Sequence, residues 1–409
     1  MPELAKISEC TGCMGCMNVC PKDAISAVEQ SDGHMGVHVD PERCIECGLC
    51  EKRCPVVNGY QYGGYNLESD YYAAWSEDDT LRRQGATSGI FGTLAATILD
   101  RGGYVVGAVN DGLRCRYRMI SGREELSQLQ GSKYTASFPD LIYRDILSRL
   151  RQGHTVLFGG LPCHVAALLN YIPDPLKANL FTADIICGGV ASPLLIKRYA
   201  EEHPDMTQVK SFRDKDGGWH PKGYRYNLKY LSADGAVHPG SPAGSRNLIT
   251  DGFACELTDR ESCYDCRFAF THRKSDLTMG DLWGDTLFPD QHPHGVSAVL
   301  AHTSRGRQLL HDSRISLHPI EPRQVLGHND RIFNGRSVKG RFPERLLFPR
   351  LIRRSSYSTL MRVYASDLRG APWYWMPFAL YRLVSFRIAE KIKKRHDRYI
   401  SRQLIPGRS

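Results

Sequence analysis

The sequence predicts a small α+β domain, then a larger α/β domain, then a basic helical extension. Eight of its fourteen cysteines lie between Cys10 and Cys54. From about residue 70 to residue 310, short apolar runs alternate with amphipathic segments, which is typical of strand–helix units. Residues 382–409 contain nine Lys or Arg against Glu390 and Asp397, so this tail accounts for seven of the nine net positive charges.

The composition indicates a globular protein, because 42% of the residues are hydrophobic and 24% are charged. The first ten residues contain no apolar stretch of the kind found in signal peptides. We therefore expect a cytoplasmic protein whose cysteines act as thiolate ligands in a reducing compartment. The near-neutral body of the chain predicts no nucleic-acid partner.

Residues 1–60 are predicted to form the first domain, because they contain two copies of one cysteine spacing. Each copy reads C-x2-C-x2-C-x3-C-P, and the copies begin at Cys10 and Cys44. This is the run of bacterial two-cluster ferredoxins, in which the fourth cysteine ligates the other cluster. Two [4Fe-4S] clusters are therefore predicted, with the ligand sets Cys10, Cys13, Cys16 and Cys54, and Cys20, Cys44, Cys47 and Cys50. Zinc sites of similar spacing are the less favoured alternative.

A Gly- and Tyr-rich connector at residues 59–66 leads into the α/β part of the chain. Its expected elements, in order, are a strand at 71–75, a helix at 90–99, strands at 104–109 and 155–158, a helix at 163–169, a strand at 181–187 and a helix at 193–202. Strand–turn–helix units predict a mostly parallel sheet that binds ligands beyond the carboxyl ends of its strands. Gly159, Cys163 and Cys187 fall at such ends.

Cys263 and Cys266 form a separate C-x2-C pair. On its own the pair is compatible with a zinc half-site, a redox dithiol or two core thiols. Because Cys163 and Cys187 lie at predicted strand-to-helix corners, four thiols are available in this part of the chain for a third cubane.

Seven short segments occur in a fixed order along the chain: ATSGI at 86–90, GSKY at 131–134, FGGLPCH at 158–164, CGGVASP at 187–193, FRDK at 212–215 with GW at 218–219, CYDC at 263–266, and RKSDLTMGDLWG at 273–284. Together they resemble the coenzyme F420 hydrogenase/dehydrogenase β-subunit family, in the bacterial branch with an N-terminal two-[4Fe-4S] ferredoxin domain. The resemblance covers about residues 1–310. This chain has Ile90, Leu161, His164 and Gly188 where the family pattern has Gly, Thr, Gln and His.

The resemblance implies that residues 70–150 and 151–315 are the N- and C-terminal parts of one domain that binds FAD and a further cluster. It implies that Thr87, Ser88, Gly89, Ser132 and Lys133 contact FAD. It also implies that the third [4Fe-4S] cluster lies beside the flavin, on Cys163, Cys187, Cys263 and Cys266.

The expected function is that of an iron–sulfur flavoprotein oxidoreductase, which passes electrons between its clusters and FAD to reduce or oxidise an organic acceptor. The resemblance links the acceptor to polysaccharide biosynthesis. Two alternatives stay open: a coenzyme F420-reducing β subunit of a hydrogenase or dehydrogenase complex, and an electron-transfer adaptor without its own substrate. The expected partners are a redox donor protein or partner oxidoreductase subunit and a small-molecule acceptor.

Several residues keep two interpretations. Lys215 and Trp219 either face the electron acceptor or belong to a surface loop, and Asp281 and Trp283 either act at the site or stabilise the fold. His164 either orients a cluster or is a satisfied core histidine.

Residues 320–409 form the basic, predicted helical extension. Its tail contacts an anionic membrane at the inner face, docks on a partner, or is simply solvated. The apolar stretch 371–381 is too short and too rich in proline to span a membrane.

Overall fold

The computed structural model describes residues 1–58, 68–215, 219, 225–241, 247–284, 287–327, 329–332, 348–365 and 391. The predicted connector at 59–66 and nearly all of the basic tail, with its aromatic stretch 371–381, lie outside these residues. Within the described part of the chain, no helix has the length and apolar character needed to cross a membrane.

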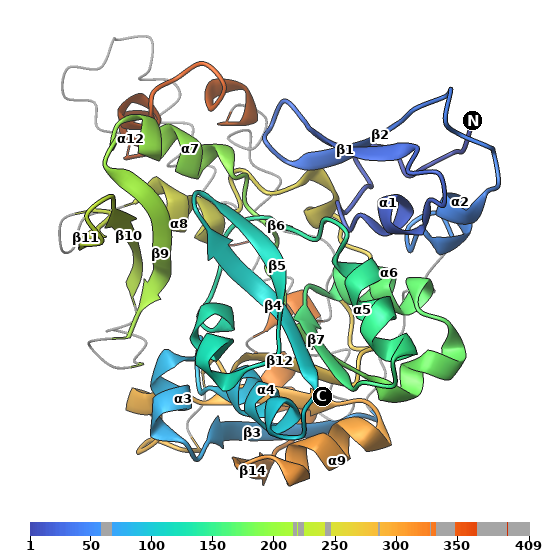
Figure 1. The fold of residues 1–409 in the computed structure, drawn as a ribbon. Coiled ribbons are helices and arrows are strands. Elements are labelled where there is room, and N and C mark those ends of the chain that lie inside the picture. Colours follow the sequence, from blue (N-terminus) through green and yellow to red (C-terminus); the bar gives the residue numbers. More distant parts are fainter. Residues whose placement is uncertain are drawn as a thin grey trace.

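A nine-stranded mixed sheet forms the centre of the molecule (Figure 1). Both predicted parts of the α/β region, 70–150 and 151–315, contribute strands to it. In spatial order, the strands are β14 (Ile315–Pro319), β3 (Asp70–Ser76), β13 (Ser297–Ala301), β12 (Leu277–Asp281), β8 (Leu180–Ile185), β7 (Val156–Gly160), β4 (Tyr104–Asp111), β5 (Arg114–Ile120) and β6 (Ser137–Phe138).

The four central strands β12, β8, β7 and β4 run parallel, as the strand–turn–helix pattern predicts. The prediction of a mostly parallel sheet is wrong for most of the outer strands, because β13, β3 and β14 pair antiparallel and β5 is antiparallel to β4. Only Gly112 and Leu113 separate β4 from β5. A connection this short can only join antiparallel neighbours, since a parallel pair needs a long crossover.

In the described part of the chain, five helices cover the sheet. They are α3 (Asp79–Gln84), α4 (Ile90–Asp100), α5 (Ile142–Arg151), α6 (Pro162–Tyr171) and α9 (Ser304–Asp312), with the 3-10 turns η1 (Arg123–Leu129) and η2 (Asp174–Asn179). Two of these helices, α4 and α6, match the helices predicted at 90–99 and 163–169. Helix α4 is buried on almost all sides, and Leu94, Ala95 and Ile98 belong to the main core with strands of the sheet. Helices that are apolar all round are stable only when surrounded by other elements, so α4 is held in place by packing.

A second, smaller unit packs beside the main sheet (Figure 1). It contains the three-stranded sheet of β9 (Met206–Asp214), β10 (Arg225–Ser232) and β11 (Val237–Pro239) and the helices α7 (Leu194–Glu201), α8 (Leu248–Ala254) and α12 (Tyr357–Ala365). Phe348, Ile352 and Leu360 are fully buried in its core against Leu195 and Leu248. Residues 348–365, which lie in the predicted basic extension, are therefore part of this core.

The N-terminal domain contains a β-hairpin of β1 (Ile25–Glu29) and β2 (Met35–Val39) and two short helices, α1 (Gly15–Val19) and α2 (Leu49–Arg53). It docks on α5 and α6. Arg144 of α5 donates hydrogen bonds to the carbonyl oxygens of Met17 (3.1 Å), Asn18 (2.9 Å) and Cys20 (3.0 Å). One side chain thus ties the end of the first cysteine loop to the larger domain.

Short elements complete the chain between the units. They are α10 (Pro322–Leu326) and the 3-10 turns η3 (Glu261–Cys263), η4 (His292–His294) and η5 (Asp330–Ile332).

Candidate functional site

The first predicted ligand set is brought together in the N-terminal domain. Burial raises the pKa of the Cys13 thiol to about 12, with smaller contributions from Cys10 and Cys54. Burial and the neighbouring thiols of Cys13, Cys10 and Cys54 raise the pKa of Cys16 in the same way. These four cysteines therefore share one environment, including Cys54 from the second copy of the repeat.

The second predicted set lines a small cavity of about 20 Å³. Its walls include Cys20 from the first copy and Cys44, Cys47 and Cys50 from the second. Cys47 is exposed, whereas Cys50 is buried. The fourth cysteine of each copy, Cys20 or Cys54, therefore lies with the first three cysteines of the other copy.

The duplicated spacing is matched by a duplicated backbone conformation. Gly12 and Met14 flank Cys13 with φ values of 68° and 55°, and Glu46 and Gly48 flank Cys47 with 54° and 69°. Left-handed residues at alternate positions turn the peptide N–H groups of a loop toward one side, which suits an anionic group. Both loops therefore fit an iron–sulfur cluster.

The third set is collected from three separate segments. Cys163, Cys187, Cys263 and Cys266 all line a cavity of about 30 Å³. Burial, followed by the thiols of Cys187, Cys266 and Cys263, raises the pKa of Cys163 well above its usual value. The thiol of Cys13 adds to this rise, and Ser262 Oγ donates to the Cys10 carbonyl oxygen at 3.1 Å. The third set therefore adjoins the first.

Among the described residues, no group of three His, Cys, Asp or Glu side chains is arranged to hold a metal ion. Ligands of a single zinc ion converge on one atom at about 2.3 Å. A cubane instead binds each thiolate at a different iron atom.

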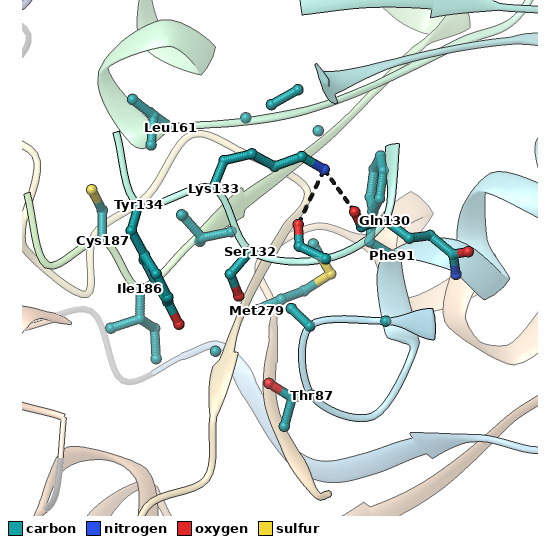
Figure 2. Close-up of a pocket in the computed structure, with 18 of the residues that line it drawn as sticks. Thr87, Phe91, Gln130, Ser132, Lys133, Tyr134, Leu161, Ile186, Cys187 and Met279 are labelled. Carbon is teal, nitrogen blue, oxygen red and sulfur yellow. Dashed lines mark hydrogen bonds between the residues drawn. The ribbon is translucent and has the colours of Figure 1, made fainter. Parts of the chain in front are cut away.

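A larger cavity of about 290 Å³ opens at the carboxyl ends of β7 and β8 (Figure 2). Nine glycines line it, at positions 85, 89, 92, 131, 159, 160, 188, 189 and 280. Glycine is required at some of these positions by packing: a Cβ at Gly159 would lie 2.2 Å from the Phe91 ring. The wall is therefore largely backbone, which lets a ligand approach peptide groups closely.

All five residues predicted to contact FAD line this cavity, but only some of their side chains are directed toward the open space. Figure 2 shows Thr87 and Ser132 among the side chains around the open space. Ser88 Oγ instead hydrogen-bonds the Ala74 carbonyl oxygen (2.8 Å) and Ser297 Oγ (2.6 Å) within the core. The ammonium of Lys133 turns to the carbonyl oxygens of Leu129 (3.2 Å) and Gln130 (2.7 Å).

The start of α4 borders the same cavity. Gly89 is its N-cap, with φ 82° and no side-chain cap. A Cβ at Gly89 would meet the backbone of Leu81 and Arg82 at 2.7 Å. The first peptide N–H groups of α4 have no partner within the helix, as at any helix N-terminus.

Lys215 fixes the loop before α4. Its Nζ donates to the carbonyl oxygens of Arg82 (2.7 Å), Gly85 (2.8 Å) and Thr87 (2.7 Å). Burial, followed by the charges of Arg213 and Arg82, lowers the pKa of this amine to about 7. The amine of Lys215 is therefore bound to the backbone of the cavity wall, rather than free in a surface loop or pointing toward an electron acceptor.

A second polar contact holds the opposite end of this loop. Asp281 accepts a hydrogen bond from the Thr87 hydroxyl, and its Oδ2 lies 3.3 Å from Arg213 Nη2. The guanidinium of Arg213 lies 3.5 Å from the centre of the Trp219 ring, a cation–π arrangement. Trp219 in turn contacts Trp283, with ring centres 5.7 Å apart.

Tyr117 is a residue of this region that the sequence patterns did not predict. Its hydroxyl accepts from the Leu161 N–H (3.3 Å) and lies 3.0 Å from His164 Nδ1. Burial lowers the pKa of His164 to about 3, so the ring is neutral. The period-two pattern of β5, which buries Cys115 and Tyr117 on one face, was the available signal.

The two cavities beside Cys187 share a wall. Leu161, Cys187, Gly189 and Val190 line both the cavity of the third cysteine set and the larger glycine-lined cavity. Whatever occupies the larger cavity therefore lies next to the four thiols.

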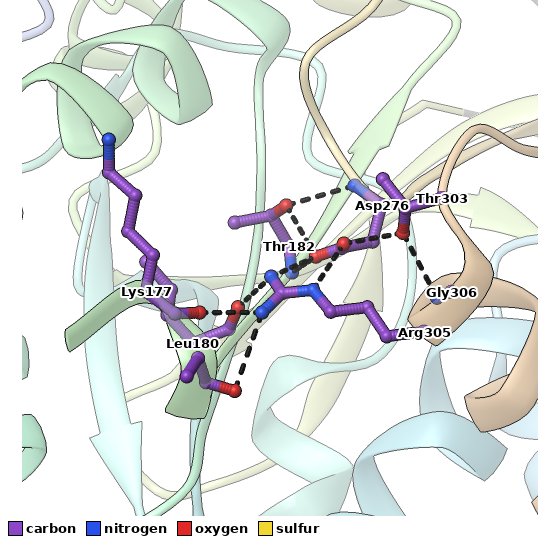
Figure 3. Close-up of polar contacts among 8 residues, drawn as sticks. Lys177, Leu180, Thr182, Asp276, Thr303, Arg305 and Gly306 are labelled. Atoms are coloured by element: carbon purple, nitrogen blue, oxygen red, sulfur yellow. Dashed lines mark hydrogen bonds and ion pairs between the residues drawn. The ribbon is translucent and has the colours of Figure 1, made fainter. Parts of the chain in front are cut away.

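A buried carboxylate joins the two strands that form one wall of the larger cavity (Figure 3). Asp276 precedes β12, and its Oδ2 accepts from the Thr182 N–H of β8 (2.8 Å) and from Arg305 Nη2 (2.8 Å). Its Oδ1 accepts from Arg305 Nε and Thr303 Oγ1, both at 2.7 Å. Arg305 also donates to the Lys177 carbonyl oxygen at 2.5 Å, so one ion pair connects β8, β12 and α9.

Three family models match the chain. The 4Fe-4S dicluster domain matches residues 9–58. The N-terminal and C-terminal models of the coenzyme F420 hydrogenase/dehydrogenase β subunit match residues 71–141 and 153–322.

Curated ferredoxins match short stretches of this chain. A 7Fe ferredoxin of Hydrogenibacillus schlegelii is 44% identical over 41 residues, which are 10% of this chain and 46% of that protein. Ferredoxin-1 of Caulobacter vibrioides is 39% identical over 49 residues, which are 12% of this chain and 39% of that protein. The chain thus spans less than half the length of these two relatives.

One solved structure similar to this chain is a chain of the F420-reducing [NiFe] hydrogenase complex from Methanosarcina barkeri. It is 17% identical, with a TM-score of 0.45, and the match covers 76% of this chain and 94% of that chain.

We expect Asp276→Asn to lower the free energy of unfolding by about 3 kcal/mol, because it leaves the partly buried Arg305 cation without its charge partner. The control is Asp312→Asn, which removes a carboxylate from an exposed ion pair with Arg101 at 3.0 Å; such pairs contribute about 1 kcal/mol or less. Denaturant unfolding under anaerobic conditions measures both. Equal losses would contradict the assigned role of Asp276.

We expect Lys215→Met to free the loop at residues 82–87, because three backbone carbonyl groups lose their donor. Amide hydrogen exchange of this segment in the intact protein should accelerate at least about tenfold, given about 1 kcal/mol for each hydrogen bond. Lys177→Met, which removes an amine bound at 2.7 Å to the exposed Asp174, is the matched control. Unchanged exchange at 82–87 would exclude this role of Lys215.

Proposed function

The chain belongs to the coenzyme F420 hydrogenase/dehydrogenase β-subunit family and carries a 4Fe-4S dicluster domain; from this premise we propose that it is an iron–sulfur flavoprotein oxidoreductase. Its three cysteine sets hold [4Fe-4S] clusters, and its glycine-lined cavity holds FAD. The iron–sulfur electron transfer follows from the family. The flavin, the third cluster and the acceptor are the proposed parts.

The observation that carries the proposal is the shared wall of the two cavities. Cys187 lines both the cavity of the third cysteine set and the glycine-lined cavity. The third set adjoins the first set through Cys13. The first and second sets are linked because the fourth cysteine of each sequence repeat lies with the other repeat, as Cys20 does in the cavity of the second set. The three sets and the cavity therefore form one continuous series.

The residues around the glycine-lined cavity fit a dinucleotide. FAD, when bound, exchanges electrons singly with iron–sulfur clusters and in pairs with an organic molecule. Gly89 leaves the N-terminal amides of α4 open toward an anionic group such as a pyrophosphate. Ser132 adds a hydroxyl group, and Thr87, whose hydroxyl donates to Asp281, can only accept a hydrogen bond from a ligand. The amine of Lys215 keeps the backbone of the 82–87 loop in position.

The second cysteine set is the proposed docking point for a redox donor protein or partner oxidoreductase subunit. Cys47 is exposed, and the apolar side chains of Met1 and Ile45 near it are 65% and 56% exposed. This is the cysteine set that a partner can approach most closely. A cytoplasmic location is proposed with it, because the thiols then stay reduced.

The acceptor is a small organic molecule with two candidates, one from the family description and one from the resemblance found in the sequence. One is coenzyme F420, the other a precursor of polysaccharide biosynthesis. Chemically reduced protein offered each compound in turn distinguishes them, because only the true acceptor reoxidises the protein in repeated turnovers. An electron-transfer adaptor without its own substrate would use neither, and would have no use for a cavity of about 290 Å³ beside Cys187.

We expect protein purified without oxygen to be brown and to release FAD on acid treatment. Cys263→Ser should lower the iron content by about a third, because one of three cubanes loses a ligand. Cys255→Ser removes a thiol outside the three sets and is the control. Absent flavin or unchanged iron in Cys263→Ser would overturn the proposal.

Two serines separate direct from indirect roles in flavin binding. We expect Ser132→Ala to weaken FAD binding about fivefold, the loss of about one hydrogen bond. Ser88→Ala should change the FAD dissociation constant by less than about twofold but lower the thermal midpoint, because its hydroxyl serves Ala74 and Ser297. Flavin fluorescence titration of the apoprotein measures both, and the reverse order would show that Ser88 contacts the flavin.

A further inference from the structure

Two buried arginines line the cavity of the third cysteine set. Arg273 and Arg331 come from different segments, and their exposed fractions are 8% and 9%. They are the charged side chains among the described residues around this cavity. Arginine remains protonated in proteins, so both positions carry a fixed positive charge.

Each guanidinium is held near the thiols by specific contacts. Arg331 Nη2 donates to the carbonyl oxygen of Cys263 at 2.8 Å. Arg273 Nε donates to the Phe270 carbonyl oxygen at 2.6 Å, and its Nη1 lies 3.5 Å from Asp184. Arg273 Nη2 is buried and has no hydrogen-bond partner within the described part of the chain. A buried donor of this kind favours an anionic group nearby.

Carboxylates also lie in this region, but behind the cavity wall. Asp184 pairs with Arg273. Burial lowers the pKa of Arg331, but Glu256 raises it, and the net change is a rise. Burial raises the pKa of Cys263, and Asp259 adds to the rise. None of these three acids lines the cavity. Arg260, a third buried arginine, packs its guanidinium on Gly12 of the first cysteine loop.

The second cysteine set has a different electrostatic environment. The charged residues that line its cavity are Lys22 and Glu46, which have opposite signs and are exposed to water. Exposed charges are screened by solvent, whereas charges in a buried site interact strongly. The two sets therefore differ in the fixed charge that faces them.

We propose that Arg331 and Arg273 tune the third cysteine set, so that an iron–sulfur cluster bound there has a more positive reduction potential than the cluster of the second set. A thiolate-bound cubane is anionic and becomes more negative when it is reduced. Nearby buried cations stabilise the reduced form more than the oxidised form, and the potential rises. This inference rests on the proposed function, because it requires the third cluster.

The test is a redox titration of the intact, iron-loaded protein, followed by electron paramagnetic resonance. In Arg331→Gln, we expect one of three titrating centres to shift to a more negative potential. At the native midpoint of that centre, its ratio of reduced to oxidised form should fall about tenfold, as expected for a charge lost from a partly buried position. Arg331→Lys, which keeps the charge, should restore most of the change.

The matched control is Arg267→Gln. Arg267 follows Cys266 directly, but its side chain is 45% exposed and pairs with Glu9 at 2.7 Å. Removing this screened charge should change the reduced-to-oxidised ratio of the same centre, at its native midpoint, by less than about twofold. If Arg331→Gln loses iron, Arg273→Gln provides a second removal of buried charge with the same expected direction.

The outcomes separate this inference from the proposed function. Three centres of which none responds to either buried arginine, or an equal response to Arg267→Gln, would overturn the tuning role and leave the function standing. Only two titrating centres, with eight rather than twelve iron atoms per chain (about four in each cubane), would overturn both.

Discussion

The close packing of the first cysteine loop on the larger domain is the constraint on which the rest of the structure depends. Gly12 leaves room for the Arg260 guanidinium, which a Cβ would approach to 2.5 Å. Gly15 lies against Ala167 of α6, one helical turn after Cys163. Gly12 has φ 68°, a backbone conformation that strains any residue with a side chain, so both its conformation and its packing on Arg260 favour glycine at this point of contact between the first and third cysteine sets.

Around the cysteine sets, the fold places positively charged and N–H groups in buried positions. Helix ends, glycine loops and strand ends supply peptide N–H groups, while Arg260, Arg273 and Arg331 supply fixed cations. Burial alone would favour neutral thiols, as the raised pKa values of Cys13 and Cys187 indicate. Iron bound at these cysteines would reverse this preference, because each ligand must be a thiolate.

Much of the site could be predicted from the chain because its chemistry is local in sequence. The duplicated cysteine run predicted how the eight N-terminal cysteines group, and the glycine-rich corners after β7 and β8 indicated where a cavity lies. Side-chain roles were less predictable. Ser88 occurs in the right segment, yet its hydroxyl is consumed by Ala74 and Ser297, partners from distant strands. Arg331 has no motif around it, and only folding brings it to Cys263.

The sequence by itself determined the family, the dicluster ferredoxin domain with its two groups of cysteines and the parallel centre of the sheet, because each depends on spacing within a short segment. Only the tertiary structure decided that β13, β3 and β14 extend the sheet antiparallel, that Lys215 secures the loop before α4, and that one wall separates the third thiol set from the glycine-lined cavity. Most of these contacts, such as those of β3 with β13 and β14 and of Lys215 with Arg82, join residues more than a hundred positions apart. Contacts at that separation are set by the packing of the whole core rather than by any local pattern.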